Sequence, residues 1–167
     1  MPVTTTRTLP AAILREVQKA VIGKDLVLTK VLLAFLAGGH VLMEDMPGVG
    51  KTTLAMAFSK ALGLNCRRVQ FTPDVLPSDL TGFSVYEKNT GTFVFQPGAL
   101  FCHLLLADEI NRTSSKTQAA LLEAMEEGNV TVEGKTYTLP RPHLVIATQN
   151  PLGCVGTQSL PESQLDR

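Results

Sequence analysis

The sequence predicts an α/β fold in which a parallel sheet lies between two layers of helices. Three observations support this prediction. Short apolar runs alternate with helical patterns, a glycine-rich loop joins the first of these runs to a helix, and two acidic residues end a later run. Apolar runs bounded by loops are typical of strands buried on both faces. The 167 residues are enough for one such domain with its own core.

Composition is that of a globular protein, with 44% hydrophobic and 18% charged residues. Fifteen basic and fifteen acidic residues balance, so bulk charge gives no support to binding of nucleic acid or a membrane surface. No apolar run approaches the length of a bilayer span, and the first seven residues lack the apolar centre of a signal peptide. The three cysteines are far apart and lack zinc-site spacing, so we expect a cytoplasmic protein with reduced thiols.

The first part of the chain is expected to be mostly helical. Apolar residues recur at helical spacing over residues 9–20, and a second helical run covers residues 26–36. The segment Val21-Ile22-Gly23-Lys24 interrupts this pattern. Ile22 and Gly23 are candidates for an adenine pocket with apolar walls and backbone amides. An ordinary turn between two helices explains the same residues equally well.

A phosphate-binding loop is predicted at residues 45–53. The apolar run Val41-Leu42-Met43 precedes it, and a helical pattern that ends at Gly63 follows it. In this order the loop amides point at an anion, and the helix N-terminus adds its positive dipole. Lys51 can then reach the β- and γ-phosphates of a nucleotide, and Thr52 can offer its hydroxyl to Mg²⁺. The expected nucleotide-binding residues are Asp45, Pro47, Gly48, Val49, Gly50, Lys51, Thr52 and Thr53.

Two β-hairpins are predicted after a second strand at residues 66–71. Residues 83–86 and 92–95 have strand character and flank a glycine turn, and residues 130–137 repeat this arrangement. An exposed hairpin can grip a partner or decorate the surface, and both interpretations stay open here.

Two acids follow the apolar run at residues 104–107. A strand buried on both faces excludes Asp108 and Glu109 unless they lie at its carboxyl end, which is the edge where ligands bind in open α/β sheets. Asp108 is therefore a candidate to hold Mg²⁺ through water, and Glu109 to orient and deprotonate an attacking water. The preceding phosphate loop strengthens both assignments.

A helix at about residues 115–127 and a strand at residues 144–148 complete the predicted core. Asn150 follows that strand, where its amide can hold the attacking water or contact the γ-phosphate. The structural alternative is that Asn150 only starts a turn before a proline. A short helical piece is expected at residues 160–167.

These motifs, in this order, resemble those of the MoxR family of AAA+ ATPases. The similarity runs from about Val21 to the end of the sequence and corresponds to the N-terminal part of a family member. Family members commonly have an acidic residue at the position of Asp45, where the general P-loop pattern has a glycine. The matching segments are residues 43–53, 70–82, 106–112, 147–151 and 160–167.

The resemblance implies a role for each matching residue. Lys51 and Thr52 correspond to the Walker A motif, Asp108 and Glu109 to the Walker B pair, and Asn150 to sensor 1. These roles agree with the chemistry that the residue types allow.

Three further residues receive roles from the resemblance alone. Arg167 corresponds to the arginine finger, whose cation completes the site of a neighbouring subunit and neutralises charge on the γ-phosphate. Arg112 is a candidate for contact with a neighbour, and Gln70 for a restraint on Glu109 before the ring assembles.

The expected fold is a three-layer P-loop NTPase core, the large subdomain of an AAA+ protein, over residues 1–167. Its strands are expected in the spatial order 41–43, 144–148, 104–107 and 66–71. In the family, a fifth core strand beside residues 41–43 and a helical lid with sensor 2 come next, and this sequence has neither. We therefore expect weak ATP binding and slow or undetectable turnover by this chain alone.

The resemblance implies Mg-ATP hydrolysis that drives the remodelling or maturation of partner proteins. Family members act as chaperone-like motors, often with von Willebrand factor A domain proteins and often in metal-centre assembly. We expect a homo-oligomeric ring, a hexamer, in which the two hairpins match the inserts that face the pore. A nucleotide-binding fragment without catalysis is the alternative. The absence of an Asn-Lys-x-Asp motif argues against a GTPase, and the water-activating acid argues against a kinase.

Overall fold

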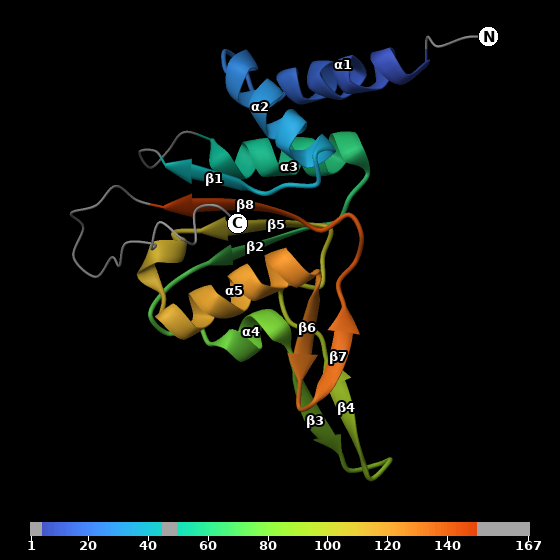
Figure 1. The fold of residues 1–167 in the computed structure, drawn as a ribbon, viewed down its shortest axis with the longest axis vertical. Helices are drawn as coiled ribbons and strands as arrows, with labels where there is room; N and C mark the ends of the chain where they lie inside the picture. The colour runs from blue at the N-terminus through green and yellow to red at the C-terminus, as the bar shows by residue number, and fades with distance from the viewer. Residues whose placement is uncertain (1–4, 45–49, 150–167) are drawn as a thin grey trace.

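A parallel sheet of four strands forms the centre of the structure, in the order β1-β8-β5-β2 (Figure 1). The computed structural model describes residues 5–44 and 50–149. The strand order predicted from the sequence is confirmed. The strands of this sheet are β1 (Val41–Glu44), β2 (Cys66–Gln70), β5 (Leu104–Asp108) and β8 (Leu144–Gln149).

Helices cover both faces of the sheet and complete the three predicted layers (Figure 1). One layer contains α1 (Thr5–Gln18), α2 (Asp25–Leu36) and α3 (Lys51–Leu62). The other contains α4 (Pro77–Thr81) and α5 (Ser115–Glu127). The expected α/β architecture is therefore confirmed.

Alternate residues of β5 face the two helical layers. Leu104 and Leu106 belong to the core cluster formed with α1, α2 and α3, and Leu105 and Ala107 belong to the cluster formed with α4 and α5. Successive side chains of a strand point to opposite faces of the sheet. Asp108, the last residue of β5, therefore lies on the α3 side.

The helix ends follow the signals in the sequence. Gly50 (φ 77°) and Gly63 (φ 65°) flank α3 in left-handed geometry, which glycine adopts without steric cost. The hydroxyl of Ser114 accepts a hydrogen bond from the Thr117 amide at the start of α5, and Gly128 (φ 65°) ends that helix. These residues fix where each helix meets the edge of the sheet.

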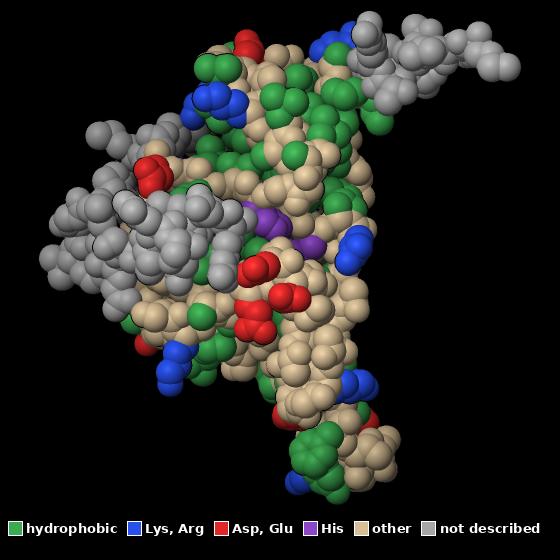
Figure 2. Space-filling model, viewed as in Figure 1, with side chains coloured by type: hydrophobic (Ala, Val, Ile, Leu, Met, Phe, Trp, Pro, Cys, Tyr) green, Lys and Arg blue, Asp and Glu red, His purple; other side chains and the backbone are tan. Residues whose placement is uncertain are grey.

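Two antiparallel hairpins project away from the sheet, as the sequence predicts (Figure 1). They are β3 (Phe83–Glu87) with β4 (Thr92–Gln96), and β6 (Asn129–Val132) with β7 (Lys135–Thr138). The ring of Phe95 stacks on that of Tyr137 with centroids 3.8 Å apart, so the hairpins lie side by side. The ring centroids of Tyr86 and Phe93 lie 5.3 Å apart near the tip of the first hairpin, and both residues are exposed, Phe93 to 72%. Hydrophobic side chains are visible at the end of the projecting hairpin (Figure 2).

Two local features differ from the sequence-based expectation. α1 begins at Thr5 rather than at residue 9, and it contains Pro10, which has no amide proton to donate to the preceding turn. A short 3₁₀ helix, η1 (Ile110–Arg112), follows the two acids, where the sequence predicts only a lead into α5. Over the described part of the chain, every helix is too short or too polar to cross a bilayer.

Candidate functional site

The candidate site lies at the carboxyl edge of the sheet. β1, β8 and β5 are mutually parallel neighbours, so their carboxyl ends meet at the same edge. The loop before α3 starts from β1, and Asp108 and Glu109 end β5. Lys51 and the two acids therefore lie on one edge with a single strand between β1 and β5.

The start of α3 has the features of an anion site. Gly50 is the N-cap residue and has no side chain that could accept hydrogen bonds from the amides of the first turn. Those amides can therefore donate hydrogen bonds to an anion. Lys51 is the first residue of the helix, and Thr52 and Thr53 follow it in the exposed first turn. This end of the helix can hold phosphate through amides, dipole and ammonium group together.

A cavity of about 350 Å³ connects the start of α3 with the turn between α1 and α2. Lys51 and Leu54 line it from α3, and Met43 from β1. Gly23 lines the opposite part, with φ 76°. Gly23, at the predicted adenine position, thus lines the same cavity as Lys51, at the predicted phosphate position.

Ile22 does not share that position. Its side chain is 87% exposed, and the residues that line the cavity begin at Gly23. A contact between Ile22 and a nucleotide stays a prediction. Lys24 and Asp25 line the cavity instead, and the sequence analysis did not single them out.

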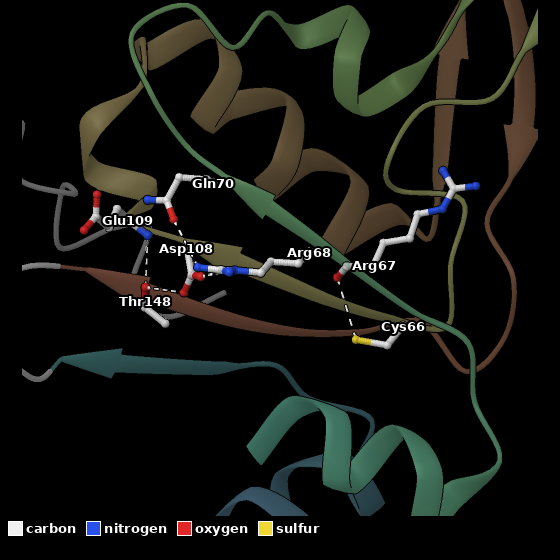
Figure 3. Close-up of polar contacts among 7 residues, drawn as sticks. All are labelled: Cys66, Arg67, Arg68, Gln70, Asp108, Glu109 and Thr148. Carbon is white, nitrogen blue, oxygen red and sulfur yellow. Dashed lines mark hydrogen bonds and ion pairs between the residues drawn. The ribbon is translucent and has the colours of Figure 1, made fainter. Parts of the chain in front are cut away.

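Asp108 is held by two side chains from neighbouring strands (Figure 3). The Arg68 guanidinium on β2 donates from Nε to Asp108 Oδ2 at 2.7 Å. The Thr148 hydroxyl on β8 donates to Asp108 Oδ1 at 3.2 Å. The carboxylate is thus buried, charge-compensated and fixed at the α3 side of the sheet edge.

Glu109 points away from Asp108 (Figure 3). Its backbone is left-handed, with φ 58°, and its amide donates to Thr148 Oγ1 at 2.9 Å. The Arg112 guanidinium donates from Nη1 to Glu109 Oε2 at 2.8 Å. This ion pair lies within the turn of η1. Contact of Arg112 with a neighbouring subunit stays a prediction.

The donor set fits a magnesium ion. Asp108 offers a buried carboxylate and Thr52 a hydroxyl, and Mg²⁺ prefers oxygen ligands of this kind. Thr148 orients Asp108 from the second coordination layer through its hydroxyl. The residues present can therefore hold a divalent cation next to bound phosphates.

Several predicted site residues lie outside the described part of the chain. Gln70 is described, and its Oε1 lies 3.5 Å from Arg68 Nη2. Arg68 and Thr148 contact Asp108, and sequence reasoning singled out neither as a site residue. The sequence feature that could have pointed to them is a polar residue within, or near the end of, a strand of the central sheet. The predicted residues outside the described ranges are Asp45, Pro47, Gly48, Val49, Asn150 and Arg167.

Comparison with known proteins gives this arrangement a context. Residues 40–167 match the ATPase family associated with various cellular activities (AAA). The chain is 54% identical over 152 residues to the uncharacterised protein YeaC of Bacillus subtilis, covering 91% of this chain and 48% of YeaC. It is 43% identical over 160 residues to chaperone MoxR1 of Mycobacterium tuberculosis, covering 96% of this chain and 42% of MoxR1.

A solved structure agrees with these sequence relationships. A crystal structure of a protein assigned as an ATPase, from Cytophaga hutchinsonii, matches with a TM-score of 0.82 and 41% identity. The match covers 96% of this chain and 49% of that one. The chain thus spans about half the length of the relatives it matches.

Proposed function

Because the chain belongs to the MoxR family of AAA+ ATPases, we propose that it carries the Mg-ATP site of a protein that hydrolyses ATP to remodel partner proteins. One observation carries this proposal. The helix that begins with Lys51 follows β1, and the two acids end β5. Both strands belong to one parallel sheet and end at the same edge of it. ATP hydrolysis needs these groups around a single nucleotide.

The groups divide the chemistry between them. Lys51 and the amides at the start of α3 bind the β- and γ-phosphates. Thr52 and Asp108 hold the Mg²⁺ ion, which when bound neutralises the negative charge of the phosphates. The ring of contacts around Asp108 keeps its carboxylate on the side of the sheet where α3 begins. This arrangement would hold the triphosphate in one orientation, with its γ-phosphorus open to attack by water.

Glu109 acts as the general base. Its carboxylate accepts a proton from a water molecule as the water oxygen bonds to the γ-phosphorus, and ADP leaves with the electrons of the broken bond. Asn150 orients that water, and Arg167 completes the site of a neighbouring subunit. Both roles derive from the family resemblance, since the two residues lie outside the described ranges.

The assembly and the partners belong to the same proposal. We take the 167 residues as the large subdomain of a subunit in a homo-oligomeric, hexameric ring in the cytoplasm. Similarity to a chaperone supports a protein client, and the exposed rings of Tyr86 and Phe93 offer an apolar contact for it. We propose that the client contains a von Willebrand factor A domain and that the remodelling serves metal-centre assembly.

Replacing Glu109 by Gln separates a motor from a module that only binds nucleotide. In the intact protein, we expect Glu109→Gln to bind ATP as the wild type does and to lose about 100-fold or more in turnover, because the amide cannot take the proton. Equilibrium binding of a fluorescent ATP analogue and steady-state phosphate release measure the two quantities.

Glu123→Gln is the matched control. Glu123 is exposed on α5, and its substitution removes the same charge without touching the sheet edge. Equal turnover by wild type and Glu109→Gln would contradict the assignment of the base. Nucleotide binding without turnover in either protein would favour the alternative, a nucleotide-binding module.

A further inference from the structure

Arg68 forms an ion pair with Asp108, the carboxylate that the proposed metal site would use. Arg68 Nε donates to Asp108 Oδ2 at 2.7 Å, in a contact between β2 and β5 (Figure 3). We propose that Arg68 sets the affinity of the nucleotide site for its divalent cation by competing with that cation for Asp108. This inference rests on the proposed function of the site.

The register of the sheet directs Arg68 to this position. Arg68 is opposite Leu106 in the parallel pairing of β2 with β5, and Leu106 faces the α3 layer as Asp108 does. Paired residues on adjacent strands lie on the same face of a sheet. Arg68 therefore approaches Asp108 from the side on which the phosphates of a nucleotide would bind.

The two partners of the ion pair differ in their freedom to leave it. The side chain of Asp108 is 10% exposed and that of Arg68 is 53% exposed. A buried carboxylate needs a compensating charge, whereas an exposed guanidinium can turn into solvent at little cost. Arg68 is therefore a counter-ion that a second cation can replace.

Competition follows from the charges alone. A divalent ion beside Asp108 would lie within a few ångströms of the guanidinium, and like charges at that range repel each other in a partly buried site. Because coupling between two ligands of one group is reciprocal, an arginine that weakens cation binding is itself weakened by the cation. Removing the charge of Arg68 must then increase the affinity of the site for the divalent cation.

The triphosphate responds with the opposite sign. A guanidinium on the α3 side attracts phosphate oxygens, so its removal does not strengthen the binding of metal-free nucleotide. Removing the charge of Arg68 should therefore lower the Mg²⁺ concentration that nucleotide binding needs, without raising the affinity for nucleotide in the absence of metal. A residue that only joins β2 to β5 would change the stability of the fold and leave the Mg²⁺ requirement as it is.

The chain offers a matched control in the preceding residue. The side chain of Arg67 extends away from that of Arg68 (Figure 3). Its Nη1 donates to the Gly98 carbonyl at 2.9 Å. Arg67→Met removes the same charge and a similar volume from the same strand. It leaves Asp108 and its partners in place.

The experiment measures binding of a slowly hydrolysed fluorescent ATP analogue to the intact protein as MgCl₂ is varied. For Arg68→Met we expect the half-saturating Mg²⁺ concentration to fall about fivefold, as befits a partly exposed ion pair. For Arg67→Met we expect no change, and Arg68→Lys, which retains the charge, should lie near the wild type. In an Asp108→Asn background the effect of Arg68→Met should vanish, because the group for which both cations compete is gone.

The outcomes separate the inference from the function on which it rests. An unchanged or higher Mg²⁺ requirement in Arg68→Met, or an equal shift in Arg67→Met, would overturn the role of Arg68 alone. A wild-type protein that binds no analogue at any Mg²⁺ concentration would overturn both the role and the proposed function. Should Arg68→Met fail to fold, Arg68→Gln takes its place with the same expected direction.

Discussion

At the scale of single residues, one hydroxyl group joins both acids of the site. Thr148 Oγ1 accepts the Glu109 amide at 2.9 Å and donates to Asp108 Oδ1 at 3.2 Å. Thr148 is itself buried at the end of β8. Thr148 therefore holds the carboxylate of Asp108 and the backbone of Glu109.

Replacing Thr148 by Val tests these hydrogen bonds. Valine has the same shape without the hydroxyl, so the Glu109 amide and one oxygen of Asp108 lose a partner, and the free energy of unfolding should fall by about 1–3 kcal/mol. Urea denaturation of Thr148→Val measures the loss, with an unchanged denaturant slope. Thr148→Ser keeps the hydroxyl and serves as control. A Thr148→Val protein as stable as the wild type would show that these hydrogen bonds contribute nothing net.

Each acid also has its own arginine. Arg68 pairs with Asp108 across two strands, and Arg112 pairs with Glu109 within one turn. The sequence predicted the acids because two charges at the end of an apolar run are incompatible with a buried position. It could not predict the Arg68 pair, because residues 40 positions apart meet only through the register of the sheet. Nor could it predict the Arg112 pair, which depends on the left-handed backbone of Glu109.

At the scale of elements, a histidine ties three of them together near the amino edge of the sheet. His40 precedes β1; its Nδ1 accepts the Val145 amide of β8 at 3.1 Å, and its Nε2 lies 3.2 Å from the Met125 carbonyl of α5. With Nδ1 as acceptor, Nε2 carries the proton and donates, so the imidazole is neutral. Burial lowers the pKa of His40, although the Met125 hydrogen bond opposes this, and burial likewise lowers the pKa of His143, which precedes β8.

These histidines give the fold a pH dependence with a definite sign. In the unfolded chain both imidazoles take up a proton at the ordinary pKa of 6.5, above their folded values. The unfolded state then binds more protons than the folded state, so the free energy of unfolding is highest above that pH and falls as the pH drops through the folded values. Urea denaturation between about pH 7.5 and 5.5 measures this loss, and a His40→Asn/His143→Asn variant should show less of it. A wild type that gained stability toward acid would contradict this account.

Element identity was the part that sequence reasoning predicted best. Apolar runs bounded by loops gave β5 and β8, and glycines gave the ends of α3 and α5, because burial and backbone freedom act locally. The strand order came from the family resemblance, since four parallel strands can be arranged in several ways. The 3₁₀ turn η1 was missed because it depends on the geometry of one residue, Glu109.

At the scale of the whole molecule, the site and the hairpins occupy different regions. The strands of the sheet end at the site, and the hairpins project from the body with exposed apolar side chains near one tip (Figures 1 and 2). The stacked rings of Phe95 and Tyr137 join the two hairpins. The proposed function assigns nucleotide chemistry to the edge of the sheet and partner contact to the hairpins.

The central claim is that one nucleotide bridges α3 and the end of β5. A crystal structure of the intact protein with Mg²⁺ and a non-hydrolysable ATP analogue tests it most directly. We expect the triphosphate at the first turn of α3 against Lys51, the cation next to Asp108 with Arg68 turned away, and the γ-phosphate in reach of Glu109. A nucleotide bound elsewhere, or a triphosphate that meets Lys51 while the cation lies far from Asp108, would contradict the account.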